Sequence, residues 1–216
     1  MRNRTEYTIW DAVTPVAVTS STDATPIVVT ATSHGFATGD LVMIYGHTTN
    51  VEANGIFKIT KVDANSFQLK DRYLGTSVAG SGAGAGSSGV VVAAPKVIDV
   101  TDFTNLVFQI TTAGTATTTV MCAGSLGKAP SDVTNSVGTD TPNFGATVSK
   151  SNPYTLLQII DLLDNTPKDG GTGVVVEGTD IAKQFEVNVN AQKYLTFIPL
   201  SWTQGSITIR LLAYSM

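Results

Sequence analysis

Three side chains have the chemistry that nucleophilic catalysis requires: His34, His47 and Cys122. Such a nucleophile works only when a base lies within hydrogen-bond reach. Both histidines fall early in the chain, Cys122 lies in a Val-Met-Cys-Ala run, and no Gly-x-Ser-x-Gly motif surrounds a serine. We therefore predict structural roles for these residues and no catalytic residue. A single cysteine cannot form an intrachain disulfide, and with two histidines it cannot complete a usual zinc site, so we predict no metal or cofactor.

Two other motifs resemble binding sites only in part. Gly124–Lys128 has two residues between its glycines, whereas a phosphate-binding loop has four and a Ser or Thr after its Lys. We predict a surface turn there. Aspartates also gather near the C-terminal third, without the alternate spacing and closing Glu of a calcium-binding EF-hand. We predict that they are solvated turn residues or face a partner subunit, and leave calcium open; they are Asp161, Asp164, Asp169 and Asp180.

Aromatic side chains in the second half of the chain could line a sugar-binding platform. Only two Trp occur in the chain, and Phe108 and Phe185 alternate with polar neighbours as core residues do. We predict core packing for most of the group and single out Trp202 and Tyr214 as the residues to check for exposure. The group comprises Phe103, Phe108, Tyr154, Phe185, Tyr194, Phe197, Trp202 and Tyr214.

The composition indicates which elements must position these residues. The 216 residues include 32 Thr and 24 Val but only 4 Glu, and β-branched side chains suit strands better than helices. A net charge of -4 argues against nucleic-acid binding, which needs a basic face. No segment approaches the roughly 20 apolar residues of a membrane helix, and no apolar stretch follows the N-terminal basic residues. We expect a soluble all-β protein that contacts neither nucleic acid nor membrane and carries no export signal.

Period-2 alternation and turn residues divide the chain into three parts. Residues 1–13 are expected to be an N-terminal arm, and residues 14–95 a small β-barrel-like module. A Gly/Ser-rich tract at 79–89, with five glycines, is predicted to be a long loop within that module. Residues 96–216 are predicted to form an antiparallel β-sandwich of jelly-roll type.

Two segments of the predicted sandwich need an explicit choice. The run Thr115–Met121 is expected to be a strand that pairs back across Ala113-Gly114. The segment Tyr154–Leu163 has apolar residues at helical spacing, but its neighbours read as strands. Periodicity cannot decide such a short apolar run, and we predict a strand.

The stretch Ile27–Val42 contains a Thr/Val strand followed by Ser-His-Gly-Phe-Ala-Thr-Gly-Asp-Leu-Val. It resembles a repeat of tailed-phage structural proteins, with the usual form Ala-x-His-Gly-(Phe/Leu)-x-(Thr/Ser)-Gly-Asp-x-Val. The continuation, Asn54–Ile59 and Val62–Leu69, is similar to that family as well. This phage module is related to the first catalytic-cysteine half-domain of ubiquitin-activating enzymes, and the resemblance, over about residues 24 to 94, implies a small β fold without ubiquitin chemistry.

The motif residues also have a physical interpretation of their own. Glycine supplies positive φ in turns, and Asp accepts hydrogen bonds from nearby backbone N–H groups. We expect the histidine to fix its loop by hydrogen bonding. The set is therefore predicted to be structural: His34, Gly35, Gly39, Asp40, Asn54 and Gly55.

Residues 96–216 resemble the β-sandwich domains of phage virion accessory proteins, through the segments 99–103, 170–178 and 185–190. Together the two resemblances imply a non-enzymatic virion component, made in the bacterial host cytoplasm, that decorates or cements the capsid or attaches to the tail. Its partners would be copies of itself, by family analogy as a trimer, and other virion proteins such as the major capsid or tail proteins.

Apolar residues on both faces of some predicted strands suggest where subunits meet. The candidate interface residues are Val107, Val175, Trp202, Leu212 and Tyr214, and the 1–13 arm is expected to reach a neighbouring protein. The alternative function is a host-receptor or carbohydrate-binding tail module, which exposed aromatics would favour. A virion hydrolase or lyase is a third class, disfavoured because no acid pair or triad is clustered in the sequence.

Overall fold

The computed structural model describes residues 4–47, 49–72, 74–80, 85–86, 88–126, 154–170 and 172–215. Within these ranges the regular elements are antiparallel strands and one short 3₁₀ helix, which confirms the all-β prediction. No helix in the described residues has the length and apolar character needed to cross a membrane. The chain divides into two units. We call residues 15–94 the curled unit, and residues 4–14, 95–126 and 154–215 the sandwich unit.

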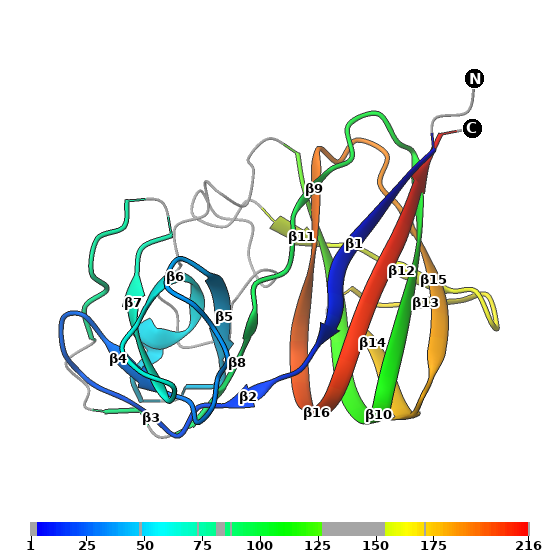
Figure 1. Cartoon of the computed structure of the whole chain (residues 1–216). Coiled ribbons are helices and arrows are strands. Elements are labelled where there is room, and N and C mark those ends of the chain that lie inside the picture. The colour runs from blue at the N-terminus through cyan, green and yellow to red at the C-terminus, as the bar shows by residue number, and fades with distance from the viewer. Residues whose placement is uncertain are drawn as a thin grey trace. The chain divides into compact units, whose positions relative to one another are not determined.

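The curled unit is one sheet whose two edges are made by adjacent pieces of the chain (Figure 1). The strand order is β2-β8-β5-β6-β7-β4-β3, and the edge strands β2 and β3 are separated only by Val18 and Thr19. A sheet whose edges are joined so closely must curl, which confirms the barrel-like character of the module. Its elements are β2 (Val16–Ala17), β3 (Ser20–Ser21), β4 (Val28–Thr30), β5 (Leu41–Tyr45), η1 (Val51–Ala53), β6 (Gly55–Lys61), β7 (Ser66–Lys70) and β8 (Val90–Ala93).

Alternating side chains of these strands fill the inside of the curl. In β7, for example, Phe67 and Leu69 are fully buried while Ser66, Gln68 and Lys70 are partly exposed. A hairpin joins β6 and β7: the Asn65 N–H donates to Asp63 Oδ1 at 2.7 Å and closes the turn. The buried core consists of Val18, Ile27, Val29, Ala31, Val42, Ile44, Ala53, Phe57, Ile59, Phe67, Leu69 and Val91.

The sandwich unit is built on two strands of 21 residues, β10 and β16, which pair along their whole length. The other strands add to this pair in the path β1-β16-β10-β15-β12-β13, with β11 and β14 also on β10 and β9 on β16. The strands are β1 (Arg4–Val13), β9 (Ile98–Asp99), β10 (Asn105–Ser125), β11 (Tyr154–Leu156), β12 (Ile159–Asp161), β13 (Thr166–Lys168), β14 (Val174–Thr179), β15 (Ala182–Asn188) and β16 (Tyr194–Tyr214).

The long pair folds over on itself and so makes both layers of the sandwich (Figure 1). The bend occurs where the β10–β16 register shifts, between Ala113 and Thr117. Gly114 and Gly205 lie there with φ of +70° and +77°, a conformation that side chains rarely adopt. Rings from the two layers then meet in the core: Phe108 contacts Phe197 with centroids 4.8 Å apart. The antiparallel sandwich is therefore confirmed, and its jelly-roll type stays a prediction.

Two sequence-based expectations about this unit differ from the structure. Residues 4–13, expected to form an arm that reaches a neighbouring protein, instead form β1 and pair with β16. The register with β16 shifts between Thr8 and Trp10, and the neighbouring side chains of Ile9 and Trp10 are both buried in the core. The expected hairpin at Ala113-Gly114 is a bend within β10, because the residues after it keep the same partner strand.

The ambiguous segment is a strand, as predicted, but an interrupted one. β11 and β12 are separated by Leu157 and Gln158, and each pairs with a different strand, β10 and β15. The Leu157 N–H donates to the Cys122 carbonyl oxygen at 2.9 Å. Because the chain changes its partner strand here, the segment does not alternate as one continuous strand.

Candidate functional site

His34 uses both of its ring nitrogens to hold its own loop. The Phe36 N–H donates to Nδ1 at 3.0 Å, which leaves Nε2 to carry the hydrogen and donate to the Asp63 carbonyl oxygen at 3.2 Å. The ring also stacks on Phe36 and meets Phe67 edge-on, with centroids 5.6 and 5.1 Å apart. At 4% exposure, His34 has no free nitrogen to offer a substrate.

The glycines and the aspartate of the same motif shape the turn into β5. Gly35 and Gly39 have φ of +74° and +99°. Asp40 Oδ2 accepts a hydrogen bond from the Ala37 N–H at 2.8 Å. The Gly39 N–H donates to the Ile59 carbonyl oxygen, and the Ile59 N–H donates to that of Asp40. These contacts fix the turn against β6.

Asn54 fixes the next segment in a similar way. Its Oδ1 accepts from the His47 N–H at 3.0 Å, and its Nδ2 donates to the His47 carbonyl oxygen at 2.8 Å. Gly55 follows at φ +140° and begins β6. The structure thus places five of the six predicted motif residues in turns or connections of the curled unit and Gly55 at the start of β6, where their side chains or positive φ values hold the backbone.

The His47 ring is buried without a partner. It is 3% exposed, and neither of its nitrogens has a hydrogen-bond partner among the described residues. It lies so close to Gly86 that a Cβ there would be 2.6 Å from both His47 Nδ1 and Ser21 Oγ. Burial lowers the pKa of His47 because the charged ring would be poorly solvated.

This burial makes the curled unit sensitive to acid. The unfolded histidine has a pKa near 6.5 and the folded one a lower pKa, so the unfolded state binds more protons below pH 6.5. Stability is therefore fully present above pH 6.5 and falls as the pH drops towards the folded pKa. We expect hydrogen-exchange protection factors of β5–β7 amides to decrease between pH 7.5 and 5.

The matched variant is His47→Leu, which keeps a buried side chain and removes the titration. Its protection factors should change much less over the same pH range. Equal losses in the two proteins would show that another group causes the acid sensitivity.

Cys122 is an inert core residue of the sandwich unit. It is fully buried in β10 opposite Phe197, and burial raises the pKa of its thiol. The predicted turn at Gly124–Lys128 is wrong for its first two residues, because Gly124 and Ser125 are still in β10 and pair with β11 and β16. Gly127 and Lys128 lie outside the described residues.

Three of the four aspartates each close their own turn, and the fourth supports a bend elsewhere in the sandwich unit. Asp161, Asp164 and Asp169 accept hydrogen bonds from the N–H groups of residues two or three positions later. Asp180 Oδ1 accepts from the Gly114 N–H at 2.9 Å and so supports the bend in β10. Hydrogen bonds from Thr166 lower the pKa of Asp164. Among the described residues, no group of three or more His, Cys, Asp or Glu side chains could hold a metal ion.

Trp202 was predicted as a candidate for exposure and for an interface, and the structure contradicts both. It is 1% exposed, packs against Trp10 with ring centroids 5.4 Å apart, and donates from Nε1 to the Gly205 carbonyl oxygen at 3.1 Å. The reason is the unexpected strand β1, which brings Trp10 over it. Tyr214 is partly exposed, and its hydroxyl donates to Glu186 Oε1 at 3.0 Å.

Two of the candidate interface residues, Val107 and Leu212, lie on one exposed face of the sandwich unit. Strands β1, β16, β10 and β15 lie side by side there, and Val107 of β10 is the register partner of Leu212 of β16. Glu6 flanks Leu212 on β1, and Glu186 flanks Val107 on β15. Val175, which is 50% exposed, is on β14 and belongs to the other layer.

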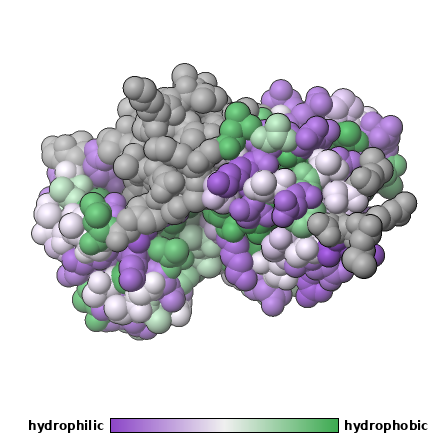
Figure 2. Space-filling model, turned by 90° about the horizontal axis from the view of Figure 1, so that it is seen from above, coloured by the Kyte–Doolittle hydropathy of each residue, from purple (hydrophilic) through white to green (hydrophobic). Residues whose placement is uncertain are grey.

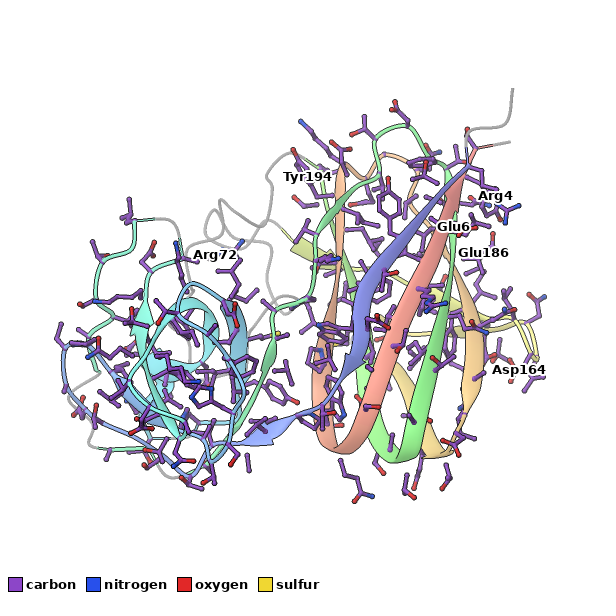
Figure 3. All side chains as sticks on the ribbon, in the orientation of Figure 1. Arg4, Glu6, Arg72, Asp164, Glu186 and Tyr194 are labelled. Carbon is purple, nitrogen blue, oxygen red and sulfur yellow. The ribbon has the colours of Figure 1, made fainter. Side chains whose placement is uncertain are left out.

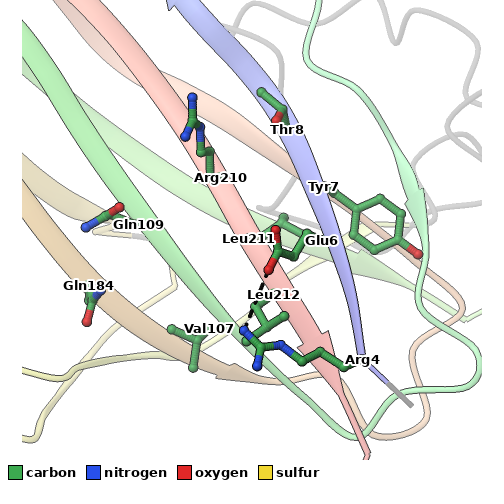
Figure 4. A pocket seen from close by; sticks show the side chains of 10 residues that line it. All are labelled: Arg4, Glu6, Tyr7, Thr8, Val107, Gln109, Gln184, Arg210, Leu211 and Leu212. Carbon is green, nitrogen blue, oxygen red and sulfur yellow. Dashed lines mark ion pairs between the residues drawn. The ribbon is translucent and has the colours of Figure 1, made fainter.

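This face is hollowed into a groove of about 510 Å³, shown in Figure 4. Val107 and Leu212 lie together in the groove. Two residues further along the same strands, Gln109 and Arg210 belong to a row of polar side chains that crosses it. Arg4 and Glu6 form an ion pair at 3.6 Å, with both side chains more than half exposed, so the pair itself adds little stability. The lining residues are Arg4, Glu6, Tyr7, Thr8, Val107, Gln109, Gln184, Arg210, Leu211 and Leu212.

The lining of the groove contains apolar and polar side chains but no His, Cys or Ser. An apolar centre with a polar rim is the usual anatomy of a protein interface. The sequence indicated Val107 and Leu212, but Arg4, Glu6 and Thr8 were missed because they were assigned to an arm.

No protein-family model matches this chain, and no curated protein matches it in sequence. Among solved structures, it is similar to the SPBc2 prophage-derived protein YomS, with 13% identity and a TM-score of 0.36 over 56% of this chain and 80% of the other. It is also similar to the PBSX exported protein XepA, with 7% identity and a TM-score of 0.35 over 99% of this chain and 82% of the other. At these scores the likeness carries no argument about function.

Proposed function

We propose that the chain is a non-enzymatic structural component of a phage virion. It decorates or cements the capsid, or attaches to the tail, through subunit–subunit contacts with itself and with other virion proteins. By analogy with the family that its motifs resemble, it assembles as a trimer. The His-Gly-Phe-Ala-Thr-Gly-Asp motif supports the phage assignment, and its residues serve the backbone of the curled unit.

One observation carries the binding role: the exposed face of β1, β16, β10 and β15 has an apolar centre. Val107 and Leu212 are side by side in the groove, on a face that a monomer would be expected to make polar. The protein has few charges to desolvate, since charged residues are 14% of the chain. Figure 2 shows hydrophobic residues in small groups among hydrophilic ones on the side that it displays.

The test is mass spectrometry of phage particles purified from cells that produce the chain. We expect the chain to sediment with intact particles and to remain on them after a high-salt wash, because an interface with an apolar centre depends little on ionic strength. Antibody labelling in the electron microscope then assigns it to head or tail. Recovery of the chain only in the particle-free lysate would refute a virion role.

The groove also favours a second candidate, a receptor- or carbohydrate-binding tail module. Gln109, Gln184 and Arg210 line it, and their amide and guanidinium groups hydrogen-bond hydroxyls well. The buried Trp202, however, cannot serve as a stacking platform for a sugar ring. Specific binding on a glycan array that is lost in Gln109→Ala would favour this second function, and no binding would leave the structural role.

A further inference from the structure

An exposed pair of leucines forms the tip of the β12–β13 hairpin. Leu163 is 91% exposed and Leu162 is 41% exposed. Single exposed leucines are common on protein surfaces, but these two are adjacent and stand on a turn of defined shape. Figure 3 shows this hairpin, with Asp164 at its tip, extending outward beyond β15. We call Leu162 and Leu163 the leucine tip.

The turn that carries the leucine tip is fixed by its own hydrogen bonds. Asp161 Oδ1 accepts from the Leu163 N–H at 3.0 Å. Asp164 Oδ1 accepts from the N–H and the hydroxyl of Thr166 at 3.0 and 2.5 Å, and Asn165 takes the left-handed conformation with φ +56°. A preshaped apolar projection loses little conformational entropy when it is buried by a partner.

The leucine tip lies on the same surface as the groove. A second hollow, of about 290 Å³, is lined by Leu162 and Leu163 at one end and by Gln109 and Gln184 at the other. The last two residues also line the groove. The exposed face of the sandwich unit therefore runs without interruption from the Val107–Leu212 pair to the leucine tip.

The charges around the groove are balanced. Arg4 and Arg210 are matched by Glu6 and Glu186 on the strands of this face. A strongly acidic or basic partner would leave two of these charges facing like charge, which costs binding energy. The β12–β13 hairpin of a second copy carries charges of both signs, Asp161 and Asp164 with Lys168, and can pair with the balanced groove. This complementarity favours a copy of the chain as the occupant.

We propose that the leucine tip of one copy inserts into the groove of another and covers Val107 and Leu212. This inference deepens the proposed function, on which it rests, by naming the surfaces that meet. A ring such as a trimer requires a heterologous contact between two different patches on each subunit. The leucine tip and the groove are such a pair, so the contact gives a physical basis for a closed ring.

The test uses disulfide cross-linking, for which this chain is well suited. Its only cysteine, Cys122, is fully buried, so introduced cysteines are the reactive ones. Chains carrying Leu163→Cys are mixed with longer, tagged chains carrying Val107→Cys, and the mixture is oxidised mildly. We expect a band that joins one chain of each kind. The control pairs Val107→Cys with Leu74→Cys, which is also highly exposed, at 80%, but belongs to the curled unit, and should give little of this band.

Light scattering on wild type and Leu163→Asp completes the test. Position 163 is almost fully exposed, so the variant should fold, with tryptophan fluorescence as the check. We expect an oligomer for wild type and dissociation towards monomer for Leu163→Asp. An oligomer that is not cross-linked at these positions and survives Leu163→Asp would overturn this contact while leaving the proposed function intact. A wild-type monomer that is still found on particles would also overturn it, whereas absence from particles would refute the proposed function itself.

Discussion

Phe108→Ala is expected to lower the free energy of unfolding of the sandwich unit by about 3–5 kcal/mol. Phe108 is fully buried in β10. Its ring stacks on Phe185 in the same layer, with centroids 5.2 Å apart, and meets Phe197 of the other layer at 4.8 Å. Truncation would open a cavity between the layers, and the loss is large beside a typical total stability of roughly 5–15 kcal/mol.

Urea unfolding followed by tryptophan fluorescence measures this loss. Trp10 and Trp202 both lie in the sandwich unit and touch each other, so their emission reports on that unit. Val175→Ala is the control: its side chain is 50% exposed, and the change should stay within about 0.5 kcal/mol. A Phe108→Ala loss no larger than that of the control would mean that the two layers do not pack through this ring.

The second large effect is expected at the bend of the long strand pair, from Gly205→Ala. At φ +77°, any side chain is strained. In addition, a Cβ at this position would lie 2.6 Å from the Thr115 carbonyl oxygen and from Ala116 Cβ. These atoms belong to the facing strand and cannot move without opening the bend. We expect the strain of about 1–2 kcal/mol plus an overpacking cost of about 1–3 kcal/mol.

Gly114→Ala separates the two contributions. Gly114 lies in the same bend at φ +70°, but a Cβ there would have no heavy atom within 4 Å. This variant should show the conformational strain alone. Urea midpoints of the two variants, compared with wild type, therefore test the geometry of the bend. If Gly114→Ala proved as costly as Gly205→Ala, the close approach of the strands at Gly205 would be wrong.

Much of the fold could be predicted because its signals are local. The pattern in Gly55–Val62 and the turn residues Asp63–Ser66 are contained in a few residues, and the structure has a strand and a hairpin there. The alternation around Phe108 likewise identified a core strand. In each case the side-chain period and the turn residues act on neighbours in the chain, so the sequence displays them directly.

The remaining features depend on residues that are far apart in the chain. Gly114 suggested a hairpin, because no local signal shows that β10 continues to pair with the same strand after the bend. The short N-terminal segment suggested an arm, because its partner, β16, lies about 200 residues away. Because the β1–β16 pairing was not predicted, the packing of Trp10 on Trp202 and the β1 side of the groove were not predicted either.

The pairing of β1 with β16 also determines how the chain can fold during synthesis. The curled unit is inserted between β1 and the rest of the sandwich unit, so all of its strands are made before most of the sandwich exists. Tyr7 pairs with Leu211. At about 5–20 residues per second, synthesis of the chain between them takes on the order of 10–40 s. Over that interval the nascent β1, with its buried-face residues Ile9 and Trp10, has no strand to join. We therefore expect the curled unit to fold first, while β1 is still unpaired. The sandwich unit folds last, after β16 has been made.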